Sequence, residues 1–229
     1  MARGPDDSGY RCLATIEVPA GDVDRYDELV CKAKTVFTQH AWKLLESGQR
    51  SAIFDTNGVP PGITRTLLHA WGIPSLNSLV DVMATAADNG DYVQAQQLTL
   101  RETQNLYMPL LWADPIGLPG TPVSLYLLEE LRIVNSIEAR TQFTNYMSSA
   151  VYTMNEKYGW KILIAGNACT GVIDHYVHLW GMSSDTAQLE EAIKEYRADP
   201  RWTAAVNHVT TSTWTLRPMP CFQETTSAT

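Results

Sequence analysis

Apolar residues in the second half of the chain recur at two spacings, which predict strands and helices. Runs rich in β-branched and aromatic residues predict strands, and apolar residues three to four positions apart predict amphipathic helices. The predicted strands are Leu125–Val134, Trp160–Ala165, Ile173–Trp180 and Val206–Leu216. One helix is predicted to follow the cap residue Ser136, and a second to span Asp185–Ala198 with Asp185 as its cap.

The first half of the chain shows the same order of elements, with helices predicted over Asp22–Ala41 and Ser75–Ala87. Each half therefore reads strand, helix, strand, strand, helix, strand, which is the split β-α-β unit of ferredoxin-like domains. A sheet that is covered by helices on one face leaves its other face in need of a partner, and a second copy can supply it. The predicted fold class is α+β, with tandem ferredoxin-like (β-α-β-β-α-β) repeats.

Matching segments in the two halves indicate an internal duplication. His69-Ala70-Trp71-Gly72 matches His178-Leu179-Trp180-Gly181, and Trp42-Lys43-Leu44-Leu45 matches Trp160-Lys161-Ile162-Leu163, in the same order. The two matching segments lie nine residues further apart in the first half than in the second. This difference places a turn-rich insertion within Gln49–Ile63.

A run rich in proline and glycine, Pro109–Pro122, separates the two halves. Such a run continues neither a helix nor a central strand. We therefore predict an N-terminal domain over residues 9–112, a linker over residues 113–123 and a C-terminal domain over residues 124–222.

The charge balance narrows the classes of partner. Lys and Arg number 17 against 25 Asp and Glu, a net charge of −8, and no basic cluster is present. Nucleic acid and anionic membranes are therefore not expected partners, and no run is apolar enough to span a membrane. The four cysteines are widely scattered, so we expect reduced core thiols in a cytoplasmic protein.

The second copy carries four motifs: Glu130-Leu131-Arg132, Tyr158-Gly159-Trp160-Lys161, Val177-His178-Leu179-Trp180 and Arg197-Ala198-Asp199-Pro200-Arg201-Trp202. Over about 90 residues it resembles a NIPSNAP-type domain of the dimeric α/β-barrel superfamily. The first copy keeps His69-Ala70-Trp71 but has Asn89-Gly90-Asp91-Tyr92 after Ala87-Asp88, so it resembles a divergent member. The resemblance implies an intramolecular dimeric α/β-barrel, in which two sheets face each other around a ligand cavity. It also implies a superfamily that includes cofactor-independent monooxygenases, polyketide cyclases, isomerases, dehalogenating enzymes and heme proteins.

Side-chain alternation along strands predicts which residues reach that cavity. If Val177 and Leu179 pack under the helices, the neighbouring positions face the cavity. The cavity side is then predicted to hold Asp174, Tyr176, His178 and Trp180, with His69 and Trp71 in the first copy. Glu130 and Arg132 also fall on this side because Leu131 and Ile133 belong under the helices, and Trp214 is expected to add to the wall.

These groups suggest acid–base chemistry on a small, hydrophobic, oxygenated substrate. We predict a cofactor-independent cyclase, dehydratase or isomerase that acts on a polyketide-type metabolite in natural-product biosynthesis. His178 is the predicted proton shuttle, Glu130 or Asp174 the second acid–base group and Arg132 the oxyanion partner. Tyr176, Trp180, His69, Trp71 and Trp214 are predicted to position the substrate.

Several alternatives stay open. The chain is alternatively a cofactor-independent monooxygenase, or a non-catalytic ligand-binding or scaffold protein whose cavity its own side chains fill. A structural role is an equal alternative to catalysis for His178, which hydrogen bonds would then hold in place beside Trp180. For Glu130 and Arg132 the structural alternative is an ion pair with each other. No metal site is predicted, because His175 and His178 point to opposite faces of a strand. No cofactor is expected, with heme on an inward histidine as the alternative, and a homodimer is compatible with the sequence.

Overall fold

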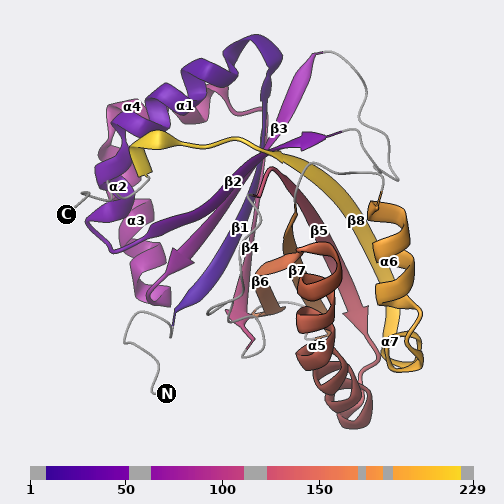
Figure 1. The fold of residues 1–229 in the computed structure, drawn as a ribbon. Helices are drawn as coiled ribbons and strands as arrows, with labels where there is room; N and C mark the ends of the chain where they lie inside the picture. The colour runs from indigo at the N-terminus through magenta and orange to yellow at the C-terminus, as the bar shows by residue number, and fades with distance from the viewer. Residues whose placement is uncertain (1–8, 52–62, 111–122, 170–173, 183–187, 223–229) are drawn as a thin grey trace, which may run out of the picture. The chain divides into compact units, whose positions relative to one another are not determined.

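The computed structural model describes residues 9–51, 63–110, 123–169, 174–182 and 188–222, and the chain divides into two compact units. Unit 1 comprises residues 1–50, 60–106 and 217–229, and unit 2 comprises residues 51–59 and 107–216. Each unit has its own buried core. The two units are therefore described separately (Figure 1).

Unit 1 is an antiparallel sheet with four helices. Its elements are β1 (Tyr10–Pro19), α1 (Val23–Lys32), α2 (Lys34–Thr38), β2 (Lys43–Ser51), β3 (Thr64–Ile73), α3 (Leu76–Asp88), α4 (Gly90–Leu98) and β4 (Arg101–Pro109). Strand β3 lies between β1 and β2, and β1 lies between β3 and β4. The even-numbered residues of β1, from Cys12 to Val18, are buried in one cluster with residues of the helices, so one face of the sheet packs against them.

Unit 2 has the same order of elements, with a long first helix. Its elements are β5 (Leu125–Ile133), α5 (Ile137–Tyr158), β6 (Lys161–Ala168), β7 (His175–Met182), α6 (Leu189–Arg197), α7 (Pro200–Ala205) and β8 (Val206–Leu216). The strand order is β8-β5-β7-β6, and the end of β4, Tyr107–Pro109, pairs with β6. Helix α5 ends at Gly159, whose φ of 67° is left-handed and whose N–H bonds to Asn155.

The α+β class that the sequence predicts is confirmed, and so is its helix cap Ser136. The Ser136 hydroxyl accepts a hydrogen bond from the N–H of Ala139 at 3.0 Å, and the Ser75 hydroxyl accepts one from Ser78 at 3.2 Å. Side-chain oxygens at these positions satisfy N–H groups that the first turn leaves unpaired. The predicted cap Asp185, the insertion between residues 52 and 62, and the linker between residues 111 and 122 lie outside the described residues.

Two helices were not predicted, and one predicted helix is interrupted. The segment Asp22–Ala41 forms α1 and α2, which are separated at Ala33. Helices α4 and α7 begin after Asn89 and Asp199, whose side chains cap them. Asn89 is followed by Gly90, and Asp199 is followed by Pro200. Glycine and proline usually interrupt helices, although proline is favoured in the first turn of a helix.

The predicted facing of β7 is wrong. Tyr176 and Trp180 belong to the core cluster that contains the helix residues Phe143 and Met147, so these even-numbered positions lie under the helices. Val177 and Leu179 are fully buried on the opposite face. Because the residues on both faces of this strand are buried, its apolar pattern carried no information about which face meets the helices.

The same correction applies to β3, whereas the facing predicted for β5 is right. Leu67 and Trp71 pack in the helix-covered core of unit 1, and His69 alternates with them on that face. On β5, Leu131 and Ile133 do pack under the helices, which leaves Glu130 and Arg132 on the other face.

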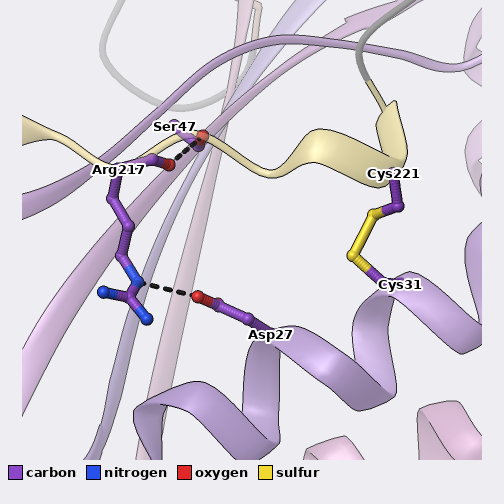
Figure 2. Close-up of a disulfide and its surroundings, with 5 residues drawn as sticks. All are labelled: Asp27, Cys31, Ser47, Arg217 and Cys221. Carbon is purple, nitrogen blue, oxygen red and sulfur yellow. Dashed lines mark hydrogen bonds and ion pairs between the residues drawn. A yellow bond between two sulfur atoms is a disulfide. The ribbon is translucent and has the colours of Figure 1, made fainter.

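The expectation of four reduced thiols is also wrong, because Cys31 of α1 and Cys221 form a disulfide (Figure 2). The segment Arg217–Phe222, called here the C-terminal strap, is held at both ends. At its start, the Arg217 guanidinium donates to Asp27 of α1 at 2.7 Å and the Arg217 carbonyl accepts from the Ser47 hydroxyl at 2.6 Å. The disulfide lies at its end. The described free cysteines are Cys12 and Cys169.

No helix among the described residues is long and apolar enough to cross a membrane.

Candidate functional site

Unit 1 contains a cavity of about 380 Å³ between its sheet and its helices. Strands β1, β3 and β4 supply one side of the cavity, and helices α1, α3 and α4 supply the other. Met83 of α3 and Val93 of α4 line it and are 67% and 38% exposed, so the cavity opens to the surface between these helices. Its volume lies in the range of about 300–1,000 Å³ that small-molecule pockets occupy.

One wall of the cavity is aromatic. Phe37 stacks on Trp71 with ring centroids 4.5 Å apart, and Phe222 of the C-terminal strap meets Trp71 edge-on at 5.2 Å. The indole N–H of Trp42 donates to the Ser78 hydroxyl at 3.2 Å, so this buried polar atom has a partner. Rigid rings with satisfied polar atoms form a flat apolar surface, which suits a ligand with a flat ring system.

His69 provides a titratable group on the sheet side of the cavity. It lies on β3 opposite Ala14, is 4% exposed, and its ring lies 6.0 Å from that of Tyr26. Burial lowers the pKa of His69 to about 4, so the imidazole is neutral near pH 7. Among the residues that the structure describes, none forms a hydrogen bond with this ring. A neutral imidazole has one acceptor nitrogen and one donor nitrogen, and His69 lines the cavity.

Glu102 of β4 supplies the charged part of the lining. Its two carboxylate oxygens accept hydrogen bonds from the amides of Gln96 and Gln104, at 3.1 and 2.6 Å. Burial, and then the charge of Glu102, raise the pKa of Cys12 and of Tyr92 to about 12. Burial and the same charge raise the pKa of Tyr26 as well. The negative potential of Glu102 therefore reaches several groups of the cavity.

The residues predicted as the site in unit 2 are distributed between two faces of its sheet. His178 is fully buried, stacks on Phe143 of α5 at 5.8 Å and lies 3.3 Å from the Tyr196 hydroxyl of α6. Tyr176 and Trp180 share its face, under the helices. Trp214 pairs with Tyr126 on the face away from the helices, the face of Glu130 and Arg132.

The other predicted acid–base groups do not meet His178. Glu130 is half-buried, and Arg132 is exposed at the end of β5. Asp174 immediately precedes β7, and its carbonyl accepts the N–H of Ile133 at 2.9 Å. The structure thus separates His178 from Glu130 and Arg132 by the thickness of the sheet. Their proposed catalytic roles stay predictions.

A different carboxylate, Glu129, lies beside His178. It is fully buried, accepts the indole N–H of Trp180 at 3.0 Å and forms an ion pair with Arg197 at 2.6 Å. Burial alone would raise the pKa of Glu129, but the hydrogen bond with His178 and the Arg197 charge hold it below its ordinary value. Burial lowers the pKa of His178. The cluster is therefore an ionised Glu129–Arg197 pair next to a neutral imidazole, enclosed in the core of unit 2.

Sequence reasoning missed Glu129, Arg197 and Glu102. Glu129 interrupts the odd-numbered apolar positions of β5, and a charge within such a run predicts a buried partner. This signal was available in the sequence. Glu102 lies on a strand with no clear alternation of polar and apolar residues, so only the folded sheet places it beside Tyr26 and Cys12.

Within the described segments, no group of three or more His, Cys, Asp or Glu residues could hold a metal ion. His175 and His178 do alternate between the faces of β7, as the strand period requires.

No protein-family model matches the sequence, and no curated protein matches it. Solved structures match over most of the chain. A candidate monooxygenase from Lactobacillus acidophilus NCFM is 11% identical with a TM-score of 0.55, and covers 90% of this chain and 93% of its own. A mutant chlorite dismutase from Candidatus Nitrospira defluvii, in complex with cyanide, is 10% identical with a TM-score of 0.58. The match covers 95% of this chain and 96% of the dismutase chain. A heme-binding protein from Thermus thermophilus is 13% identical with a TM-score of 0.54, covering 93% of both chains.

These similarities define the class of fold. The chain has the ferredoxin-like fold of the dimeric α/β-barrel monooxygenases and of chlorite dismutases. At such low identity the likeness is one of fold alone.

The prediction of a cyclase, dehydratase or isomerase is corrected by these comparisons. The activities named among the similar structures are monooxygenase and chlorite dismutase, and the predicted class is not among them. The monooxygenase alternative is the better supported of the hypotheses. Nothing supports a polyketide substrate.

Some structures with this fold bind heme, so the fit of the described residues to heme decides whether that group belongs here. An axial histidine must present a ring nitrogen to open space, and His178 has no exposed surface. His69 does border a cavity, but the charged side chain of its described lining is the carboxylate Glu102. Heme brings two further carboxylates, and buried anions require cationic partners. Neither His178 nor the described lining around His69 fits heme.

Proposed function

We propose that the chain is a cofactor-independent monooxygenase that oxidises a flat, hydrophobic, oxygenated ring compound in the cavity of unit 1. The observation that carries this proposal is the cavity itself, where the neutral imidazole of His69 stands beside an aromatic wall. The shared fold with candidate monooxygenases supports the same function.

The reaction needs an acidic C–H bond in the substrate, a proton acceptor and dioxygen. His69 accepts the proton from an activated CH₂ group, and the substrate carbanion supplies both electrons to O₂ as a C–O bond forms. The resulting peroxide takes the proton back and loses water, so that R–CH₂–R′ and O₂ give R–CO–R′ and H₂O. The cavity contributes by orienting the substrate and by excluding water from the carbanion.

Two of the predicted positioning residues, His69 and Trp71, keep a role in this proposal because both line the cavity. His178, Glu130, Arg132 and Asp174 have none, because they belong to unit 2 and do not line it.

We also propose that the two units descend from one duplicated NIPSNAP-like domain. Their common order of elements supports this origin. So does the His-x-Trp-Gly segment, which lies on the third strand of each unit and faces the helices in both.

Oxygen uptake tests the function. A hydroxylated anthrone, whose ring CH₂ is activated, is mixed with the protein under ¹⁸O₂, and the rate without protein is subtracted. We expect one O₂ consumed per substrate and a ketone product that carries one ¹⁸O. His69→Gln should lower kcat by about 10²-fold or more. The matched control, His208→Gln, changes an exposed histidine of unit 2 and should turn over normally.

Binding of the anthrone without protein-dependent oxygen uptake would overturn the monooxygenase proposal. That outcome would favour the non-catalytic ligand-binding protein. Full turnover by His69→Gln would remove His69 from the mechanism.

A further inference from the structure

The described lining of the unit 1 cavity combines a polar patch with an aromatic wall. Glu102 and Gln104 of β4 and Gln96 of α4 form the polar patch. Phe37, Trp42 and Trp71 form the aromatic wall. A ligand that contacts both therefore has a flat apolar body and a polar group.

The carboxylate of Glu102 is oriented and has unused capacity. Each of its oxygens accepts one amide hydrogen bond, from Gln96 or from Gln104. A carboxylate oxygen has two acceptor positions, so each can accept one more hydrogen bond. The Gln96 amide also donates to the Tyr92 hydroxyl at 3.2 Å, which fixes Gln96 between Glu102 and Tyr92.

The charge of Glu102 is not neutralised by a cation of the described lining. No Lys or Arg is among the described lining residues, and the imidazole of His69 is neutral near pH 7. A ligand carboxylate placed here would meet a like charge in a partly desolvated site, which is unfavourable. A ligand hydroxyl would instead donate a hydrogen bond to an ionised acceptor, one of the stronger kinds of hydrogen bond.

We propose that Glu102 makes this cavity selective for neutral phenolic ring compounds and against their carboxylate analogues. This inference rests on the proposed function and names the substrate class of the same site. The phenolic O–H donates to Glu102, and the ring system lies along Trp71 and Phe37.

Calorimetric titration with two probes of the same ring size tests the selectivity. Naphthalen-2-ol is the neutral phenol and naphthalene-2-carboxylate is the anion, each titrated into the full chain at pH 7. We expect the phenol to bind the wild-type protein at least about tenfold more tightly than the carboxylate. Equal binding of the two probes would overturn the proposal while leaving the cavity, and the proposed reaction, intact.

The variant Glu102→Gln distinguishes the effect of the Glu102 charge from a preference of the apolar wall for any neutral ligand. It keeps an acceptor oxygen for the neighbouring amides and removes the negative charge. The preference for the phenol should fall to about twofold or less, mainly because the carboxylate binds more tightly. The control Asp88→Asn removes one negative charge from the exposed end of α3, outside the lining, and should keep the wild-type ratio.

An unchanged ratio in Glu102→Gln would show that the apolar wall alone rejects anions, and would overturn the role of Glu102. If neither probe binds the wild-type protein, the cavity is not a ligand site and the proposed function fails with it. Oxygen uptake without selectivity, or selectivity without oxygen uptake, distinguishes the two proposals.

Discussion

His69 and His178 occupy corresponding places in the same four-residue motif, yet their surroundings differ. His178 is enclosed by Phe143 and Tyr196 next to the ion pair of Glu129. His69 borders a cavity, with no hydrogen-bond partner for its ring among the described residues. The motif therefore specifies a strand and its packing, and the neighbouring side chains decide whether the imidazole can meet a ligand.

The depressed pKa of His69 predicts a pH-dependent stability. In the unfolded chain a histidine takes up its proton as the pH falls below about 6.5, whereas His69 in the folded protein does so only near 4. Between these values the unfolded state binds more protons, so the free energy of unfolding falls as the pH is lowered. The full effect corresponds to about 3 kcal/mol.

Urea unfolding of the wild-type protein and of His69→Gln at pH 7, 5.5 and 4 measures this effect. Other groups titrate in both proteins and cancel in the difference. The wild-type protein should lose stability relative to the variant across this range. Parallel curves for the two proteins would show that His69 is not buried in the neutral form.

At the scale of elements, the strands show what apolar pattern determines and what it leaves open. Strand β8 begins and ends where the pattern predicts, at Val206 and Leu216, and α5 begins after its predicted cap. The facing of β7 was inverted, since residues on both of its faces are buried. On β5 the facing was right, because its exposed Arg132 marks one face as polar.

The C-terminal strap is the element whose removal has the clearest expected effect. The disulfide joins residues 190 positions apart (Figure 2), and a crosslink that closes a long loop restricts the unfolded chain. The double variant Cys31→Ser/Cys221→Ser should lose about 2–5 kcal/mol of unfolding free energy. Tryptophan fluorescence should also change, because Phe222 of the strap contacts Trp71.

The control for this measurement is Cys169→Ser, which removes a free, half-buried thiol of unit 2. Its stability should stay within about 0.5 kcal/mol of the wild-type value. Mass spectrometry of the unreduced protein should find Cys31 linked to Cys221, with Cys12 and Cys169 as thiols. A fully reduced protein with unchanged stability would contradict this account of the strap.

At the scale of the whole molecule, each unit has its own core, and the chain crosses between them more than once. The C-terminal residues from Arg217 return to unit 1, where Met219 is buried in its core. The expectation of a cytoplasmic protein rested on reduced thiols, and the Cys31–Cys221 disulfide removes that premise.

The separate cores predict that damage to unit 2 spares the unit 1 cavity. Arg197→Met leaves the buried carboxylate of Glu129 without its cation and should cost about 3–5 kcal/mol. The control Arg201→Met breaks an exposed pair with Asp199, and its free energy of unfolding should stay close to the wild-type value. Urea unfolding measures both variants.

Under native conditions, Arg197→Met should still bind naphthalen-2-ol with an affinity within about twofold of wild type, because its side chain does not line the cavity. Loss of binding in a folded Arg197→Met protein would show that the two units do not act independently.

The local features of this protein follow from its sequence alone: the succession of the strands and of most helices, the cap Ser136, and the repeated His-x-Trp-Gly segment. These depend on residues close together in the chain, whose spacing and hydrogen-bonding groups act within one or two turns. Three features could be seen only in the folded chain: which face of β3 and β7 meets the helices, the Cys31–Cys221 disulfide, and the meeting of Glu102 and His69 around one cavity. Each of these depends on contacts between distant segments, which form because the folded core satisfies both partners at once, and spacing along the chain does not specify them.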